Sequence, residues 1–181
     1  MSNRMVAGWM VACLVGLGVS AAMAAESEHM APVAAPSADL ERIKQLAGRW
    51  EGTSQEGEGE GEATPATIEY KVTSGGSAVV ETLFAGTPHE MVSVYHDVGG
   101  KLSLTHYCML GNQPELSLVS ADGGNMSFRL SPGSPIPASE PHMGALTLTQ
   151  DGTGGLTQVW IATINGEPAP PTTIRVKRTG S

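Results

Sequence analysis

The segment HEMVSVYHDVGGKLSLTHYCMLGNQP, residues 89–114, decides the fold that we expect for this chain. Two runs rich in β-branched and aromatic residues, 90–96 and 101–108, flank the short turn 97–100, which contains aspartate and two glycines. This pattern predicts two antiparallel strands joined as a hairpin. Three of the five histidines lie in the same segment, so we also expect the functional site here.

The same alternation of short strands and turns continues along the chain. Aromatic residues make up only 4% of the sequence, whereas there are 23 glycines and 12 prolines, which favours short strands over a helical bundle. Besides the strand around Trp50, the predicted strands are 66–73, 77–84, 90–96, 101–108, 115–120, 126–131, 143–150, 156–164 and 172–178. Short loops between them require antiparallel neighbours, so we predict an all-β, up-and-down barrel of about ten strands.

The first 24 residues have the features of a secretory signal peptide. A basic start at Arg4 is followed by an apolar run of about fifteen residues and by the small-residue cleavage site Ala22-Met23-Ala24. Residues 25–36 then predict a flexible tether, and residues 37–181 a single domain. We therefore expect a periplasmic or secreted protein with no membrane span after cleavage, and with Cys108 as its only cysteine.

A short helix is predicted directly before the first strand. Ser37 is a helix N-cap, apolar residues recur at helical spacing over 38–47, and Gly48 ends the run. Gly48-Arg49-Trp50 then opens the first strand.

This order of elements, with its G-x-W motif, resembles the calycin group of barrels, which includes lipocalins, fatty-acid-binding proteins and nitrobindin-like proteins. The resemblance implies that Trp50 closes one end of the barrel and stacks on a basic residue near the last strand, either Arg175 or Arg178. It also implies carriage of a small hydrophobic or amphipathic ligand in the barrel interior.

Two segments stand outside the strand pattern. Residues 56–62 alternate glutamate and glycine, which predicts a solvated loop between the first two strands, and clustered carboxylates leave calcium binding as an alternative. Residues 132–141 contain four prolines, which cannot pair within a sheet, so this segment is predicted to be an external loop.

The register of the central hairpin determines which side chains share a face. We expect Asp97 to pair with Lys101, because this register gathers the apolar side chains on one side. The inner face is then predicted to carry Val92, Val94, Leu102 and Leu104, together with Glu90, His106 and Cys108.

A candidate ligand site follows from this register. Glu90 and His106 would form a pair inside an apolar interior, within a strand or two of Glu81, because a buried carboxylate needs a partner. Asn112 and Gln113 are predicted to edge the barrel opening. Cys108 is predicted to lie on the same face. It would either pack as a small apolar residue or act as a reactive thiol near the His106 imidazole.

Three functions remain open from the sequence. The first is binding of a small hydrophobic or amphipathic molecule; the second is a haem or metal site that uses His106, with His96 or His89 as a further ligand. The third is a non-catalytic envelope or interaction protein with a filled barrel. The net charge of −8 without a basic cluster argues against nucleic acid, and the chain lacks the common hydrolase, phosphate-binding and dinucleotide motifs.

Overall fold

The computed structural model describes residues 35–57, 59, 61–137 and 139–179. The predicted signal peptide and most of the predicted tether lie outside the described residues, so both stay predictions. Among the residues described, no helix is long and apolar enough to cross a membrane.

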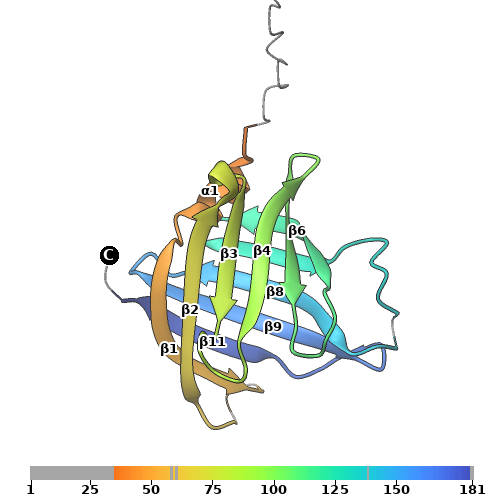
Figure 1. Cartoon of the computed structure of the whole chain (residues 1–181). Helices are drawn as coiled ribbons and strands as arrows, with labels where there is room; N and C mark the ends of the chain where they lie inside the picture. Colours follow the sequence, from red (N-terminus) through yellow and green to blue (C-terminus); the bar gives the residue numbers. More distant parts are fainter. Residues whose placement is uncertain (1–34, 58, 60, 138, 180–181) are drawn as a thin grey trace, which may run out of the picture. The chain divides into compact units, whose positions relative to one another are not determined.

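Ten antiparallel strands form a closed barrel, as predicted (Figure 1). An eleventh strand, β10, has only two residues and pairs with the end of β9. The strands are β1 (Gly48–Glu56), β2 (Thr64–Thr73), β3 (Ala78–Leu83), β4 (Met91–Val98), β5 (Lys101–Tyr107), β6 (Glu115–Asp122), β7 (Asn125–Leu130), β8 (His142–Gln150), β9 (Gly155–Ile164), β10 (Glu167–Pro168) and β11 (Thr172–Arg178).

The barrel is a meander from β1 to β9 that β11 closes. Each strand up to β9 pairs with the next, and β11 lies between β9 and β1, pairing with both. A closed sheet has no free edge along which another chain could add. The acidic segment joins β1 to β2 and the proline-rich segment joins β7 to β8, as expected.

The one α-helix in the described part of the chain covers one end of the barrel. Helix α1 (Ala38–Lys44) begins at Ser37, whose hydroxyl accepts a hydrogen bond from the Leu40 amide. Ser37 also donates from its amide and its hydroxyl to the carboxylate of Asp97 at the end of β4, at 2.7 Å in both cases. Leu40 and Ile43 are buried, so the apolar face of α1 closes this end, and the predicted helix is confirmed.

Trp50 and Arg178 fix the helix to the barrel wall. The Trp50 indole N–H donates to the Leu46 carbonyl at 2.8 Å, and the Arg178 guanidinium lies 4.4 Å from the centre of the indole ring. The same guanidinium donates to the carbonyls of Gln45 and Ala47, which follow α1. Of the two arginines predicted to stack on the tryptophan, the structure selects Arg178.

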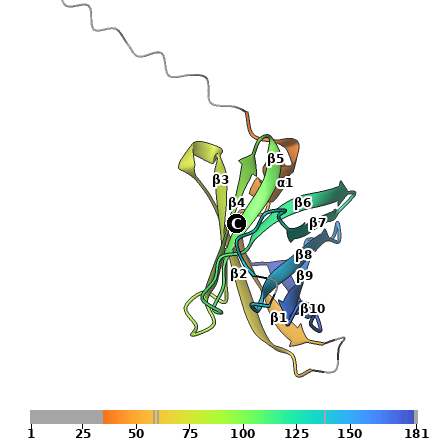
Figure 2. The ribbon, with the colours of Figure 1, turned by 90° about the vertical axis from the view of Figure 1, so that its right-hand side faces the viewer.

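The opposite end of the barrel, which we call the mouth, is formed by the loops 57–63, 84–90, 108–114, 131–141 and 165–171. Figure 2 shows β2, β3 and β4 on one side of the barrel and β8 and β9 on the other. Inward side chains of both walls form one buried cluster, which includes Tyr70, Tyr95, Phe128 and Trp160.

Replacement of Arg178 tests the contact between helix and barrel. We expect Arg178→Ala to lower the free energy of unfolding by about 1–2 kcal/mol, because a cation–π contact and hydrogen bonds to helix-terminal carbonyls are lost together. Arg175→Ala is the matched control, since Arg175 is exposed on the same strand, and we expect a change of less than about 0.5 kcal/mol. Urea unfolding followed by circular dichroism measures both; equal effects would contradict the assignment.

Candidate functional site

The turn between β4 and β5 differs from the predicted one, and the difference changes the inner face. Val98 pairs with Lys101, so the loop contains only Gly99 and Gly100. Both glycines have positive φ, 59° and 78°, as the two central residues of a type I′ turn require. The expected pairing of Asp97 with Lys101 is wrong by one residue, because a two-residue Gly-Gly loop is preferred to a three-residue loop.

The one-residue shift reverses the faces of β4. Ser93 and Tyr95 are fully buried, whereas Val92 and Val94 are only half-buried. On β5 the prediction holds, because Leu102, Leu104 and His106 are buried. His106 therefore faces the interior together with Ser93 and Tyr95.

The predicted pair of Glu90 and His106 does not form. Glu90 is exposed in the loop before β4, where its carboxylate accepts a hydrogen bond from the Gly86 amide at 2.6 Å. The carboxylate that reaches the interior is Glu81 on β3, which has no exposed surface. Glu81, which we placed near the site, is the buried carboxylate, but Ser93 lies between it and His106.

Four polar residues form a continuous row across neighbouring strands. Tyr70 on β2 lies opposite Glu81 on β3, Glu81 lies opposite Ser93 on β4, and Ser93 lies opposite His106 on β5. All four side chains are buried. Because directly opposed residues in a sheet point to the same side, this polar row crosses the inner wall of the barrel from β2 to β5.

Residues from the opposite wall reach the polar row. The side-chain amide of Gln158 on β9 donates to the Tyr70 hydroxyl at 2.7 Å and to the Glu81 carboxylate. The Trp160 indole N–H donates to the Gln158 side-chain carbonyl at 2.8 Å. The Trp160 ring also lies 4.7 Å from the His106 ring, at an interplanar angle of 39°. The two walls are thus joined by side-chain contacts at this level.

Burial sets the protonation of these groups. It raises the pKa of Glu81 above its usual value, while hydrogen bonds from Tyr70, Gln158, Ser93 and Tyr95 act in the opposite direction. Burial also raises the pKa values of both tyrosines well above 10, so both keep their protons.

His106 has one satisfied and one unsatisfied ring nitrogen. Its Nδ1 lies 3.0 Å from the Ser93 hydroxyl, but its Nε2 is buried and has no hydrogen-bond partner among the described residues. Burial lowers the pKa of His106 from 6.5 to about 4, so the ring is neutral at physiological pH. A neutral, oriented imidazole with one free nitrogen can bond a ligand or coordinate a metal centre.

The other predicted site residues lie in loops at the mouth. Asn112 donates to the Glu140 carboxylate at 3.0 Å and to the Pro141 carbonyl at 2.8 Å, so it ties two mouth loops together. Gln113 is exposed and donates to the Gly111 carbonyl. Cys108 is a half-buried free thiol just beyond β5. These residues are not in the polar row.

Two further observations concern metal binding and a buried histidine at the mouth. The described residues contain no cluster of three or more histidine, cysteine, aspartate or glutamate side chains that could hold a metal ion. His142 is buried at the start of β8, with Nδ1 2.7 Å from the Glu140 carbonyl.

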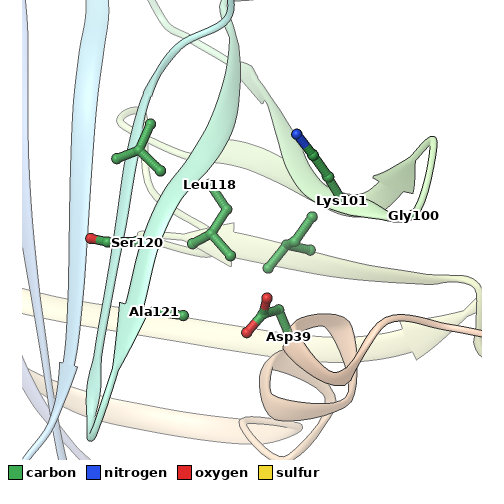
Figure 3. Close-up of a pocket in the computed structure, with 8 residues that line it drawn as sticks. Asp39, Gly100, Lys101, Leu118, Ser120 and Ala121 are labelled. Atoms are coloured by element: carbon green, nitrogen blue, oxygen red, sulfur yellow. The ribbon is translucent and has the colours of Figure 1, made fainter.

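An open depression lies beside α1 at the helix-covered end, where β5 and β6 separate after three paired positions (Figure 3). Its lining includes Asp39 of α1, Lys101 of β5 and Leu118 and Ser120 of β6. None of the lining residues belongs to the polar row, so we treat the depression as separate from the candidate site.

The sequence alone did not identify Tyr70, Ser93, Tyr95, Gln158 and Trp160 as site residues. The Gly-Gly pair at 99–100 was the available signal for Ser93 and Tyr95, since it favours the two-residue turn. Gln158 and Trp160 had no comparable signal, because β9 carries apolar residues on both faces.

Comparison with solved structures supports the fold. The crystal structure of Rv2717c from M. tuberculosis matches with a TM-score of 0.54 and 12% sequence identity, covering 81% of this chain and 100% of that chain. At this identity the match shows a common barrel fold, consistent with a calycin-like barrel, and nothing of ligand or activity. No family model and no curated protein sequence matches the chain.

The lowered pKa of His106 predicts acid sensitivity. Between pH 6.5 and about 4 the unfolded chain binds a proton at this residue and the folded chain does not, so stability falls as the pH falls through this range. The full effect is about 3 kcal/mol. We expect the stability of the His106→Phe variant to fall much less than that of the wild type over this pH range. Urea unfolding at several pH values measures the difference.

Glu81 is present in both the wild type and the His106→Phe variant, so its own titration cancels when the two are compared. His89→Phe is the matched control, because His89 is exposed in a mouth loop and should keep the wild-type pH dependence. A His106→Phe protein with the same acid sensitivity as the wild type would contradict the assignment.

Proposed function

We propose that this chain is an exported small-ligand-binding protein that holds a small hydrophobic or amphipathic molecule in the barrel interior, in contact with His106. The observation that carries the proposal is the buried His106 Nε2, which has no partner among the described residues. An unsatisfied buried polar atom costs about 1–3 kcal/mol, and a ligand that bonds it removes this penalty. The surrounding walls are apolar, as in most small-molecule sites.

The residues toward the mouth also support an interior ligand. Inward positions at this end carry small side chains, namely Ser54 on β1, Ala66 on β2 and Ala162 on β9. His106 lies near the same end, one residue before the end of β5. Small side chains at this end occupy less of the interior than large ones would, which supports a ligand near His106.

Tryptophan fluorescence provides a direct test, because Trp160 stacks on His106. We expect a saturable fluorescence change with at least one of a series of lipophilic alcohols, fatty acids, aromatic probes and haem. His106→Phe should weaken that binding about tenfold, which is the effect of one lost buried hydrogen bond. Trp160→Phe should remove the signal while binding, followed by calorimetry, remains.

Retained folding of each variant is checked by circular dichroism. The absence of any saturable change across the series would contradict the proposal and would favour a filled, non-catalytic envelope protein. Binding that is unaffected by His106→Phe would place the ligand elsewhere on the molecule.

Haem is a second candidate, and one observation favours it. A haem iron needs a single protein ligand, and the His106 ring is held through Nδ1 with Nε2 free, as in many metal-binding histidines. An isolated metal ion has less support, because the described residues contain no multi-residue metal cluster. Titration with haem should produce a Soret band that His106→Phe abolishes; a wild-type protein without such a band would exclude this candidate.

A further inference from the structure

We infer that the interior site takes an amphiphile with an ammonium headgroup, which bonds Asn112 and His106 on the inner wall beside the Glu140 carboxylate. This ligand class rests on the proposed function, because it specifies the headgroup of the same interior ligand. Two features of the mouth point to it: a second unsatisfied atom on the wall that carries His106, and an excess of negative charge.

The Asn112 side chain holds a buried acceptor without a donor. Among the described residues, two buried side-chain atoms have no hydrogen-bond partner, Nε2 of His106 and Oδ1 of Asn112, and Asn112 is only 8% exposed. The Asn112 Nδ2 atom lies 3.0 Å from the Glu140 carboxylate and 2.8 Å from the Pro141 carbonyl. A backbone carbonyl can only accept, so these contacts fix the orientation of the amide. The free atom is therefore the amide oxygen, which needs a donor from elsewhere.

The two unsatisfied atoms belong to the same inner wall. Beyond the last paired position of β5 and β6, the His106 amide donates to the Pro114 carbonyl at 2.9 Å and the Cys108 amide to the Asn112 carbonyl at 3.1 Å. These bonds continue the antiparallel register, so Asn112 is a diagonal neighbour of His106. Burial alternates accordingly, because Asn112 and Pro114 are buried and Gln113 is exposed. Asn112 therefore shares the inner face with His106, at the separation of about 7–8 Å that diagonal neighbours have.

A single ammonium group can satisfy both atoms. It has three N–H donors, one for the Asn112 oxygen and another for Nε2 of His106. The Ser93 hydroxyl, 3.0 Å from Nδ1 of His106, can accept a hydrogen bond as well as donate one, so the ring can present a lone pair at Nε2. Since burial keeps this imidazole neutral at physiological pH, it does not repel a cation.

The charge of the mouth favours a cation over a neutral or anionic headgroup. The five mouth loops contain six glutamates and no lysine or arginine. Ion pairs within the described residues occur on α1 and around Arg49, namely Arg42–Asp39, Lys44–Glu41, Arg49–Glu51 and Arg49–Glu69. The Glu140 carboxylate accepts from the neutral Asn112 amide and forms none of these pairs. An uncompensated negative surface attracts a cation and repels an anion, and an ammonium donor bonds more strongly than a hydroxyl.

Four ligands with the same dodecyl chain length separate charge from hydrogen bonding. Dodecylamine has a positive charge and N–H donors, 1-dodecanol has a donor without charge, dodecyltrimethylammonium has charge without a donor, and laurate is an anion. At neutral pH we expect dodecylamine to bind about tenfold more tightly than dodecanol or dodecyltrimethylammonium, and laurate to bind most weakly. Calorimetry below the micelle concentration measures this. Equal affinities, or tighter binding of laurate, would overturn the inference while leaving the proposed function in place.

Glu140→Gln removes the charge and keeps the contact between the loops, because a glutamine oxygen can still accept from Asn112. We expect this variant to weaken dodecylamine binding about fivefold and to leave dodecanol binding unchanged. Glu167→Gln is the matched control, since Glu167 is an exposed mouth glutamate that is not bonded to Asn112. Equal losses of dodecylamine affinity in the two variants would contradict the position of the headgroup.

Asn112→Ala removes the unsatisfied acceptor itself. Binding of dodecylamine and of dodecanol should weaken, whereas binding of dodecyltrimethylammonium, which has no donor, should change little. Gln113→Ala is the control in the same loop, because Gln113 is exposed. Circular dichroism checks that each variant is folded; if Asn112→Ala is not, Glu140→Gln and the comparison of the four ligands decide the question.

The failure of the inference and the failure of the proposed function have different results. If none of the four dodecyl ligands binds, the ammonium headgroup is wrong. If the lipophilic alcohols, fatty acids, aromatic probes and haem also fail to bind, the proposed function is wrong as well.

Discussion

The interior of this barrel is organised around one buried carboxylate, that of Glu81. Removal of an ionised carboxylate from water costs several kcal/mol, roughly, unless hydrogen bonds replace its hydration. The structure supplies such bonds from Tyr95 on β4 and Gln158 on β9, and no buried cation takes part within the described residues. Since β9 lies across the barrel from β4, the bonds to Glu81 also join the two walls, and they orient the neighbouring side chains.

The two ends of the barrel have different roles. At one end, the apolar face of α1 and the stacked pair of Trp50 and Arg178 close the interior. At the mouth, small side chains line the inner wall and five loops connect the strands. A molecule that reaches His106 must therefore enter from the mouth, where the Asn112 amide ties the loop after β5 to the loop before β8.

Much of the fold could be predicted from the sequence because it depends on local signals. Turn residues between short apolar runs indicated the ten barrel strands, and the Ser37 cap with its periodic apolar residues indicated α1. The stacking partner of Trp50 could be narrowed to two arginines but not chosen, because the choice depends on how far the last strand extends past the first.

The site was harder to predict because its residues meet through register and across the barrel. One residue more or less in the 97–100 turn decides whether Glu90 or Ser93 shares the inner face with His106, and the apolar pattern of β4 favoured the wrong register. The contact of Gln158 with Glu81 joins residues 77 positions apart, and neither face of β9 marks Gln158 as special. Long-range polar contacts of this kind have no counterpart in local sequence patterns.

A purely structural interior does not explain His106. A phenylalanine at this position could keep the contact with Trp160 and would remove the unsatisfied Nε2. Histidine also makes the protein less stable as the pH falls below 6.5, because the folded state holds the ring neutral. Stability alone therefore favours an apolar residue at position 106. The unsatisfied Nε2 and the acid sensitivity are offset only when another group bonds to Nε2. The hydrogen bond between Nδ1 and Ser93 holds the ring in place for such a partner, which is what a binding site requires and a filled core does not.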